Sequence, residues 1–508
     1  MKQINKSQDM KNNLYKYLID HKKNDPDKIS IISENNEITY RKLLKLIDLL
    51  EIYLVNNLNI KENDRIAILS TNRIEYIILL YASAKIGSSL VPINWRLTDY
   101  EIENILNEVK PKVLFSEKEF IKENHNILKI TKLNVVDINF NNSFYSKIKN
   151  KNINNNSIKK IKNNINKTIL IIYTSGTTGK PKGAMLTQKA LFYNNLNSIH
   201  MHQFNKKDII LTVIPLFHVG GLNIQTIPAL HIGATVILLK KFDIIQTIKF
   251  IKRYRPTYTV FVPSILKEIV KLNNWKSKLN SLKAITTGST IVSPELIETY
   301  EKKSIKIIQV YGSTETCPIA ICQNINDERK PYGNVGKPAL KTKIKLFSNN
   351  NSKYGEIGVK GLNLFSGYWN NKKNSKEYLN NGWFMTGDIA EKNKDNKYFI
   401  LGRNKDLIIS GGENIYPAEV ERIINQVKNI EESAVIGIPD DKWEEVPIAF
   451  IKIKNKSYSS NEVFQTMKTK LARYKIPKKI ITIDEVPKNA LGKIDYKILK
   501  EYYKNLDL

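Results

Sequence analysis

The amino-acid sequence predicts an α/β protein, with a large N-terminal domain of layered sheets and helices and a small, mobile α+β C-terminal domain. Its 508 residues, 42% of them hydrophobic, can bury large cores but are too many for one ordinary domain. Short apolar runs alternate with amphipathic helical patterns through the first four-fifths of the chain, which is typical of parallel sheets covered by helices. The pattern changes near Gly402. We therefore expect one domain over residues 1–402 and a second over residues 403–508.

The alternation of strands and helices is clearest between residues 65 and 115. The apolar run RIAILS indicates a buried strand, and the apolar residues after it recur at helical spacing until Gly87, an expected helix terminator. Another strand, another helix and a third strand follow. The expected elements are the strand Arg65–Ser70, the helix Ile74–Ile86, the strand Leu90–Ile93, the helix Thr98–Val109 and the strand Lys112–Phe115.

Two later segments organise the rest of the chain. Residues Asn139–Lys167 are rich in Asn, Lys and Ser and lack periodicity, so we expect a surface linker or loop there. Beyond a short hinge at residues 402–406, short elements of both kinds indicate the small α+β domain. These are the helix Ala418–Asn425, the strands Ser433–Ile438 and Ile448–Lys454, and the helix Ser460–Arg473.

The composition excludes several classes of protein. The two cysteines, Cys317 and Cys322, exclude a disulfide scaffold and favour a reducing compartment; with no His nearby, we expect them to be small buried side chains. No uninterrupted apolar run reaches the roughly 20 residues of a membrane span, and the N-terminus is not of secretory type, so we expect a cytoplasmic protein without stable membrane insertion. The net charge of +31 comes from Lys spread along the chain, without a compact DNA- or RNA-binding motif. We therefore expect no nucleic-acid partner, although a positive field would attract polyanions.

The strongest local signal is the string YTSGTTGKPKG at Tyr173–Gly183, directly after a strand-like run. Its three glycines let the backbone approach a ligand closely, and successive N–H groups in such a turn can form an anion-binding nest. Hydroxyl groups and two lysines add donors and charge, so the composition is that of a polyphosphate cradle. The spacing of a Walker A loop is absent. The candidate phosphate-binding residues are Thr174, Ser175, Gly176, Thr177, Thr178, Gly179 and Lys182.

Four further motifs carry groups suited to nucleotide chemistry. Glu315 ends the string QVYGSTE, and a hard cation prefers a carboxylate together with phosphate oxygens. Asp388 ends GWFMTGD and can accept both hydroxyls of a ribose, while Arg403, fifteen residues later, is a second contact or a simple ion-pair partner. His218 lies in the apolar run PLFHVGG, and Lys493 follows Gly492 in PKNALGK. Taken alone, such a His is more often a core residue and such a Lys a solvated charge.

In their order, these motifs resemble those of the adenylate-forming superfamily, which includes acyl-CoA synthetases, firefly luciferase and the adenylation domains of peptide synthetases. The resemblance covers nearly the whole chain, from Ile38–Leu43 (ITYRKL) and Val91–Leu97 (VPINWRL) to Lys493. The sequence departs from it in two places. Gln188 stands where many relatives have His, and Ile-Asp-Tyr follows Lys493 where relatives usually carry basic residues.

The resemblance implies roles for the residues around the nucleotide. The loop residues would hold the phosphates, and the turn containing Gly288, Ser289 and Thr290 would lie along the adenine. Tyr311, followed by Gly312, would stack on the adenine. Thr314 would bind the α-phosphate or the acyl carboxylate, and Glu315 would hold Mg²⁺ together with Thr178.

It also implies roles for residues nearer the acid, the ribose and the C-terminal domain. His218 would be a gate or a neighbour of the substrate carboxylate, and Asp388 and Arg403 would contact the ribose. Lys405 would be the hinge, with Gly411 and Gly412 lining a pantetheine tunnel. Lys493 would reach the bridging or α-phosphate oxygen as the catalytic lysine.

The reaction that the resemblance implies is that of an ATP-dependent acyl-CoA synthetase. The carboxylate of a small-molecule acid attacks the α-phosphate, pyrophosphate leaves with Mg²⁺, and the thiol of coenzyme A then displaces AMP. No side chain acts as a nucleophile, so catalysis rests on positioning and charge stabilisation. The expected cofactors are ATP, Mg²⁺ and coenzyme A, and the sequence allows for a homodimer.

The acid is expected to be a medium- or long-chain fatty acid, because apolar segments surround His218 and no charged residue stands out for a second polar group. The alternative is an aromatic acid, of the o-succinylbenzoate or 4-coumarate type. A luciferase-type oxidase or a peptide-synthetase domain would share the fold. A catalytically inactive ATP-binding or nucleic-acid-binding protein is the alternative from another class, and the intact set of motif residues argues against it.

Overall fold

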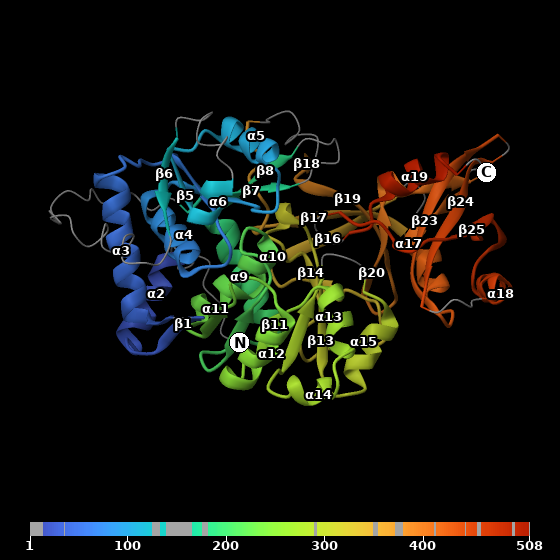
Figure 1. Ribbon diagram of the computed structural model, residues 1–508, viewed down its shortest axis with the longest axis horizontal. Coiled ribbons are helices and arrows are strands. Elements are labelled where there is room, and N and C mark those ends of the chain that lie inside the picture. Colours follow the sequence, from blue (N-terminus) through green and yellow to red (C-terminus); the bar gives the residue numbers. More distant parts are fainter. Residues whose placement is uncertain are drawn as a thin grey trace.

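The computed structural model describes residues 14–34, 36–123, 133–138, 165–174, 181–288, 292–348, 354–370, 379–410, 413–441, 443–454, 459–489 and 493–506. Across these ranges the chain forms four β-sheets (Figure 1). Three of them belong to the large N-terminal domain, and the fourth belongs to the small C-terminal domain at the right of Figure 1. The fold class predicted from the sequence is therefore confirmed.

A six-stranded sheet holds the first βαβ units, in the order β6-β5-β3-β4-β7-β8. Its strands are parallel except for β8, which runs antiparallel to β7. The predicted helix is α4 (Ile74–Ile86), which ends at Gly87 with a left-handed φ of 80°. Thr98 caps α5 (Asp99–Val109) through a capping box with Glu101, which explains where this helix starts. The strands are β3 (Arg65–Leu69), β4 (Ser89–Ile93), β5 (Val113–Ser116), β6 (Asn134–Asp137), β7 (Thr168–Thr174) and β8 (Lys182–Thr187).

A nine-stranded sheet forms the second layer, in the order β15-β14-β13-β12-β11-β9-β10-β1-β2. The strands from β1 through β13 along this path are parallel, with α12 (Ile244–Tyr254), α13 (Pro263–Val270) and α15 (Pro294–Glu301) as crossovers. The strands are β1 (Ile29–Ser33), β2 (Asn36–Thr39), β9 (Ile209–Thr212), β10 (Thr235–Leu238), β11 (Tyr258–Val260), β12 (Ala284–Thr287), β13 (Lys306–Tyr311), β14 (Ile321–Cys322) and β15 (Lys337–Pro338).

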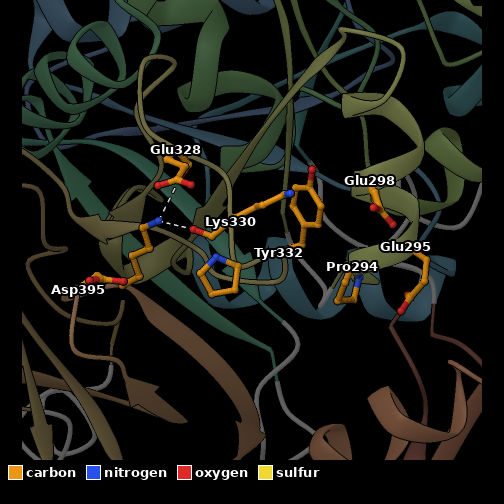
Figure 2. Close-up of a pocket in the computed structure, with 9 residues that line it drawn as sticks. Pro294, Glu295, Glu298, Glu328, Lys330, Tyr332 and Asp395 are labelled. Carbon is orange, nitrogen blue, oxygen red and sulfur yellow. Dashed lines mark hydrogen bonds between the residues drawn. The ribbon is translucent and has the colours of Figure 1, made fainter.

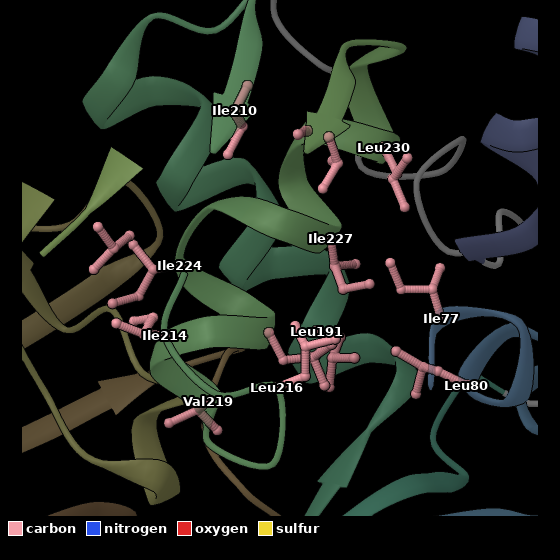
Figure 3. Close-up of a cluster of buried hydrophobic side chains, with 14 of the residues drawn as sticks. Ile77, Leu80, Leu191, Ile210, Ile214, Leu216, Val219, Ile224, Ile227 and Leu230 are labelled. Carbon is pink, nitrogen blue, oxygen red and sulfur yellow. The ribbon is translucent and has the colours of Figure 1, made fainter. Parts of the chain in front are cut away.

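A buried apolar cluster joins these two layers (Figure 3). Helix α9 (Gln188–His202), π-helix η2 (Leu222–Thr226) and α11 (Ile227–Ile232) contribute side chains that meet residues of α4 and β9. Each fully buried Leu or Ile contributes about 1.5–3 kcal/mol relative to exposure. The cluster in Figure 3 includes Ile77, Leu80, Leu191, Ile210, Ile214, Leu216, Val219, Ile224, Ile227 and Leu230. Near the N-terminus, α2 (Leu14–Asn24) packs on α3 (Tyr40–Asn56) and α4.

The third sheet is antiparallel and leads toward the C-terminal domain. Its order is β16-β17-β19-β18, with β20 paired to β19. The strands are β16 (Thr342–Phe347), β17 (Tyr354–Gly361), β18 (Leu379–Asn380), β19 (Trp383–Lys392) and β20 (Tyr398–Arg403). A single 3₁₀ turn, η4 (Asn404–Asp406), then connects β20 to the fourth sheet.

The fourth sheet has the order β22-β21-β24-β23, with β25 parallel to β24, and buries two apolar clusters of its own. The predicted strand Ser433–Ile438 lies within β23, and the predicted strand Ile448–Lys454 overlaps β24 up to Ile453. Both strands are longer than expected because they form one continuous antiparallel ladder. The predicted second helix ends at Lys470 rather than Arg473. The elements are β21 (Ile408–Ser410), β22 (Glu413–Ile415), α17 (Pro417–Ile424), β23 (Ile430–Asp440), β24 (Glu444–Ile453), α18 (Ser460–Lys470), β25 (Lys479–Thr482) and α19 (Tyr496–Lys504).

Three smaller expectations have clear outcomes. Cys317 and Cys322 are both buried and free, as predicted. The expected linker at residues 139–167 falls outside the described residues up to position 164. In the described ranges, none of the helices has the length and apolar character needed to cross a membrane.

Candidate active site

The carboxyl ends of three parallel strands gather the predicted residues at one edge of the nine-stranded sheet. His218 follows β9, Gly288 follows β12, and Tyr311 ends β13, so their positions at this edge follow from the topology. Two close approaches require glycine here. A Cβ atom at Gly288 would lie 2.5 Å from the carbonyl oxygen of Val310, and one at Gly312 would lie 1.7 Å from that of Pro318.

Asp388 is held between two of the other predicted residues. Its Oδ2 accepts a 2.7 Å hydrogen bond from the hydroxyl of Tyr311, and its Oδ1 lies 2.7 Å from Nε of Arg403. Asp388 and Arg403 are register partners on β19 and β20, which is why their side chains meet. Burial raises the pKa of the Asp388 carboxyl, and the charge of Arg403 opposes that shift. The structure thus unites three residues that come from separate motifs.

Glu315 lies in a buried 3₁₀ turn, η3 (Thr314–Thr316), with Thr314 at its start. The hydroxyl of Tyr368 donates a 2.7 Å hydrogen bond to Oε1 of Glu315. The ring of Tyr368 lies 5.6 Å from Nζ of Lys182, so one aromatic side chain touches both the predicted phosphate loop and the predicted metal ligand. Sequence reasoning missed Tyr368, because no motif pointed to it and only the tertiary contact reveals it.

Lys493, which belongs to the C-terminal domain, interacts with the charges of Arg403, Asp388 and Glu315. Burial and the nearby Arg403 lower the pKa of the Lys493 ammonium, while Asp388 and Glu315 raise it. These influences show that the lysine lies among the charged groups of the N-terminal domain. Asn489 holds the backbone of Lys493, since its Oδ1 accepts from the backbone N–H of Lys493 at 3.1 Å and its own backbone N–H donates to the carbonyl of Lys493 at 2.8 Å.

His218 is uncharged near neutral pH. Burial, followed by the charges of Arg96 and Lys493, lowers the pKa of the His218 imidazole to about 4. Its Nε2 is buried and has no hydrogen-bond partner among the described residues. The ring lies 4.6 Å from that of Phe217, and the guanidinium of Arg96 lies 5.7 Å from the Phe217 ring. The side chain of Arg96 is a second feature that sequence reasoning did not single out.

The remaining predicted residues divide into three groups. Thr174 and Lys182 are register partners on β7 and β8 and hold the two ends of the phosphate loop. Lys405 is exposed in η4, between the two domains. The others lie outside the described residues: Ser175, Gly176, Thr177, Thr178, Gly179, Ser289, Thr290, Gly411 and Gly412. The departure at Gln188 is structural, because its buried Oε1 accepts a 2.9 Å hydrogen bond from the backbone N–H of Leu14.

A cavity of about 600 Å³ lies elsewhere on the N-terminal domain (Figure 2). It is bordered by the first turn of α15, by residues 328–332 and by the turn between β19 and β20. Lys397 closes one wall by donating to the carbonyl oxygens of Glu328 (3.2 Å) and Lys330. None of the predicted site residues lines this cavity, so it is distinct from the charged cluster around Asp388.

Comparison with known proteins extends over both domains. The family model described as AMP-binding enzyme matches residues 19–369, and that described as AMP-binding enzyme C-terminal domain matches residues 419–493. The indoleacetate–CoA ligase of Aromatoleum aromaticum is 37% identical over 481 residues, which cover 92% of this chain and 94% of the relative. The 2-succinylbenzoate–CoA ligase of Bacillus pumilus is 30% identical, with coverage of 94% and 95%. The ATP-bound MatB from Rhodopseudomonas palustris has a TM-score of 0.88 at 27% identity, with coverage of 97% and 99%.

Proposed function

The chain belongs to the family of AMP-binding enzymes and is an AMP-forming acid–CoA ligase, and we propose that the acid it activates is aromatic. The observation that carries this proposal is the 37% identity, over nine-tenths of the chain, to a ligase whose named acid is indoleacetate. The 2-succinylbenzoate ligase, whose named acid also contains an aromatic ring, supports it independently.

The fatty-acid expectation is less well supported than this aromatic alternative, and the structure explains why the sequence favoured it. Its main evidence was the apolar pattern around His218. Leu216, Val219 and Leu222 are each at most 7% exposed and pack in the domain core. The apolar pattern therefore reflects the packing of α10 (Val219–Gly221) and η2 between the two sheets, and it does not identify the acid.

In the proposed reaction, the residues of the site act by position and charge. The carboxylate of the acid attacks the α-phosphate of ATP, pyrophosphate leaves, and the thiol of coenzyme A then displaces AMP from the acyl-adenylate. Lys493 supplies a partly buried cation beside Asp388 and Glu315, where the phosphates of a bound nucleotide would lie. Such a preorganised charge stabilises the negative charge that develops on the α-phosphate. Asp388 accepts the ribose hydroxyls, with Arg403 and Tyr311 fixing its orientation.

Magnesium is part of the same proposal. The described residues contain no group of three or more His, Cys, Asp and Glu side chains gathered to hold a metal. Glu315 nevertheless suits Mg²⁺, because this ion is usually held by one or two carboxylates together with the phosphates of the substrate. When bound, it neutralises charge on the leaving pyrophosphate. The second predicted ligand, Thr178, lies outside the described residues.

Acid-dependent ATP–pyrophosphate exchange tests the proposed substrate class. The panel contains indole-3-acetate, phenylacetate, 2-succinylbenzoate, ferulate, hexanoate and laurate. We expect kcat/KM for the best aromatic acid to exceed that for either fatty acid by about tenfold or more, since pocket shape discriminates at this level. Added coenzyme A should then release AMP together with the thioester. Faster exchange with hexanoate or laurate than with every aromatic acid would contradict the proposal.

A further inference from the structure

The loop between β9 and α10 carries His218 and runs outside the nine-stranded sheet. β9 ends at Thr212, and residues 213–218 belong to neither a helix nor a strand. Ile214 and Leu216 of this loop are at most 9% exposed and lie in the apolar cluster of Figure 3. Buried backbone N–H and C=O groups need hydrogen-bond partners. The position of the loop therefore depends on the groups that supply them.

The side-chain amide of Asn72, in the loop that follows β3, supplies these partners from the other sheet. Its Oδ1 accepts a 2.8 Å hydrogen bond from the backbone N–H of Leu216, and its Nδ2 donates to the carbonyl of Ile214 at 3.1 Å. Nδ2 also donates to the carbonyl of Leu239, directly after β10, at 3.0 Å. Asn72 is only 6% exposed. An amide offers two N–H donors and one carbonyl acceptor, so this side chain satisfies three buried backbone groups at once.

The loop that carries Asn72 is itself anchored. The backbone N–H of Asn72 donates to the carbonyl of Lys240 at 2.9 Å. The backbone N–H of Thr71 donates to Oε1 of Glu117, a buried residue after β5, at 2.7 Å. Oε2 of Glu117 lies 3.3 Å from Nζ of Lys240. Asn72 is therefore held by both sheets before it contacts the loop of His218.

The segment that Asn72 holds leads directly to His218. The backbone N–H of His218 donates to the carbonyl of Pro215 at 3.3 Å, and Pro215 lies between the two residues that Asn72 contacts. A Cβ atom at Gly221 would lie 2.2 Å from the same carbonyl oxygen, so α10 packs closely against this peptide. A shift of residues 214–216 would consequently move His218 and the start of α10 with them.

We propose that Asn72 is a positioning residue for the acid side of the active site, because its side chain fixes the backbone of residues 214–216 and thereby the place of His218. Asn72 acts through the loop and needs no contact with the substrate. The expected effect on activity rests on the proposed function as an acid–CoA ligase. The effect on the place of His218 is independent of that function.

The first measurement follows His218 itself. Asn72→Leu keeps a side chain of similar size but removes all three hydrogen bonds. In full-length protein with isotope-labelled histidine, the Cε1–H signal of His218 is assigned by its loss in His218→Gln. We expect this NMR signal to shift in Asn72→Leu, while the signal of His200, half-buried on α9, stays in place.

The second measurement follows the acids of the panel in ATP–pyrophosphate exchange. Asn72→Leu should lower kcat/KM for the best acid about 100-fold, which is the loss that a small misplacement of active-site groups can cause. The ratio of kcat/KM between the best acid and the poorest should move toward one, since a displaced loop changes the shape of the pocket. The dissociation constant of ATP, measured by calorimetry, should change less than about twofold. A smaller fraction of folded enzyme alone would leave the ratio between acids unchanged.

Asn334→Leu is the matched control. Asn334 is 1% exposed, and its amide also satisfies three backbone groups: the carbonyls of Arg329 (2.9 Å) and Pro331 (2.8 Å) and the N–H of Gly336 (2.9 Å). None of these residues belongs to the predicted site. Asn334→Leu should lower the Tm as Asn72→Leu does, because both leave buried backbone groups without these partners, but it should change neither the His218 signal nor the ratio between acids.

An unshifted His218 signal together with an unchanged ratio between acids in Asn72→Leu would assign Asn72 a purely structural role and overturn the proposal. If Asn72→Leu does not fold, the same two measurements on Asn72→Asp decide, since this variant keeps the size and the acceptor but loses both donors. A wild-type protein that exchanges with none of the acids would refute the proposed function. The His218 signal would still decide whether Asn72 positions the loop.

Discussion

The hydroxyl of Tyr368 donates a 2.7 Å hydrogen bond to Oε1 of Glu315, while the Tyr368 ring lies 5.6 Å from Nζ of Lys182. The backbone around Tyr368 is fixed from two sides. Met185 of β8 donates its N–H to the carbonyl of Gly367 at 3.0 Å, and Phe365 donates to the carbonyl of Glu315 at 2.8 Å. Residues 365–368 thus link β8, the strand after the phosphate loop, to the carboxylate of Glu315, which is proposed to hold magnesium.

Tyr368→Phe should therefore weaken the apparent affinity for magnesium more than the apparent affinity for the acid. Removing the phenolic donor frees the Glu315 carboxylate to rotate, and a hydrogen bond to a charged group contributes about 1.5–3 kcal/mol. We expect the Mg²⁺ concentration for half-maximal ATP–pyrophosphate exchange to rise about tenfold, with the KM for the acid unchanged. Tyr100→Phe, at a tyrosine that is 73% exposed, is the control. An unchanged Mg²⁺ dependence would separate Tyr368 from the metal site.

Three histidines of the N-terminal domain, of which His202 and His231 are buried and His218 is half-buried, predict a loss of stability in acid. Burial lowers the pKa of His202 and of His218 to about 4 and that of His231 to about 3. In the unfolded chain an imidazole takes up its proton near pH 6.5, so below that pH the unfolded state binds more protons than the folded state. The free energy of unfolding should fall as pH drops from about 6.5 toward 4, by about 1.4 kcal/mol per pH unit for each histidine.

Thermal unfolding between about pH 8 and pH 5 measures this effect. The Tm of the N-terminal domain should be nearly constant above pH 7 and should fall below it. His202→Gln should make that fall shallower, whereas the matched change at half-buried His200 should not. Burial raises the pKa of Glu421 to about 7, which stabilises the folded state in acid, but Glu421 lies in the C-terminal domain. A Tm of the N-terminal domain that rises between pH 7 and 5 would contradict the prediction.

Lys405→Pro should uncouple the two half-reactions. Lys405 is exposed in the 3₁₀ turn that joins β20 to β21, and proline fixes φ near −65° while restricting the residue before it. A hinge motion needs a few residues that absorb a large backbone change. We expect this variant to retain at most one of adenylation and thioester formation. Lys405→Ala removes the side chain but leaves the backbone free, so it should retain both; wild-type rates for both steps in Lys405→Pro would exclude this hinge.

Elements with local causes could be predicted from the sequence. The helix Ile74–Ile86 has the predicted bounds because its apolar spacing and Gly87 determine them locally. Asp388, Arg403 and Tyr311 were predicted as separate motif residues, and the sheet topology brings them together. The roles of these residues stay predictions.

Other features depend on contacts between distant segments. Tyr368 and Glu315 are 53 positions apart, and Arg96 meets Phe217 from a different layer, so neither pairing has a local signature. The fatty-acid interpretation is less well supported for a related reason. An apolar run looks the same in sequence whether it faces a substrate or the domain core, and the run around His218 packs largely in the core.

We propose that Lys493 of the small domain serves adenylation within the nucleotide cluster of the large domain. The most direct test of this central claim is to measure the two half-reactions separately in Lys493→Ala, with Lys488→Ala as the control. Lys488 lies in the same segment but pairs with Glu432, 2.7 Å away. Acid-dependent ATP–pyrophosphate exchange should fall by about 2.7–4 kcal/mol in transition-state stabilisation, as for one preorganised donor. The reaction of a pre-made acyl-adenylate with coenzyme A should keep most of its rate. Equal loss of both half-reactions, or full exchange activity in Lys493→Ala, would contradict the claim.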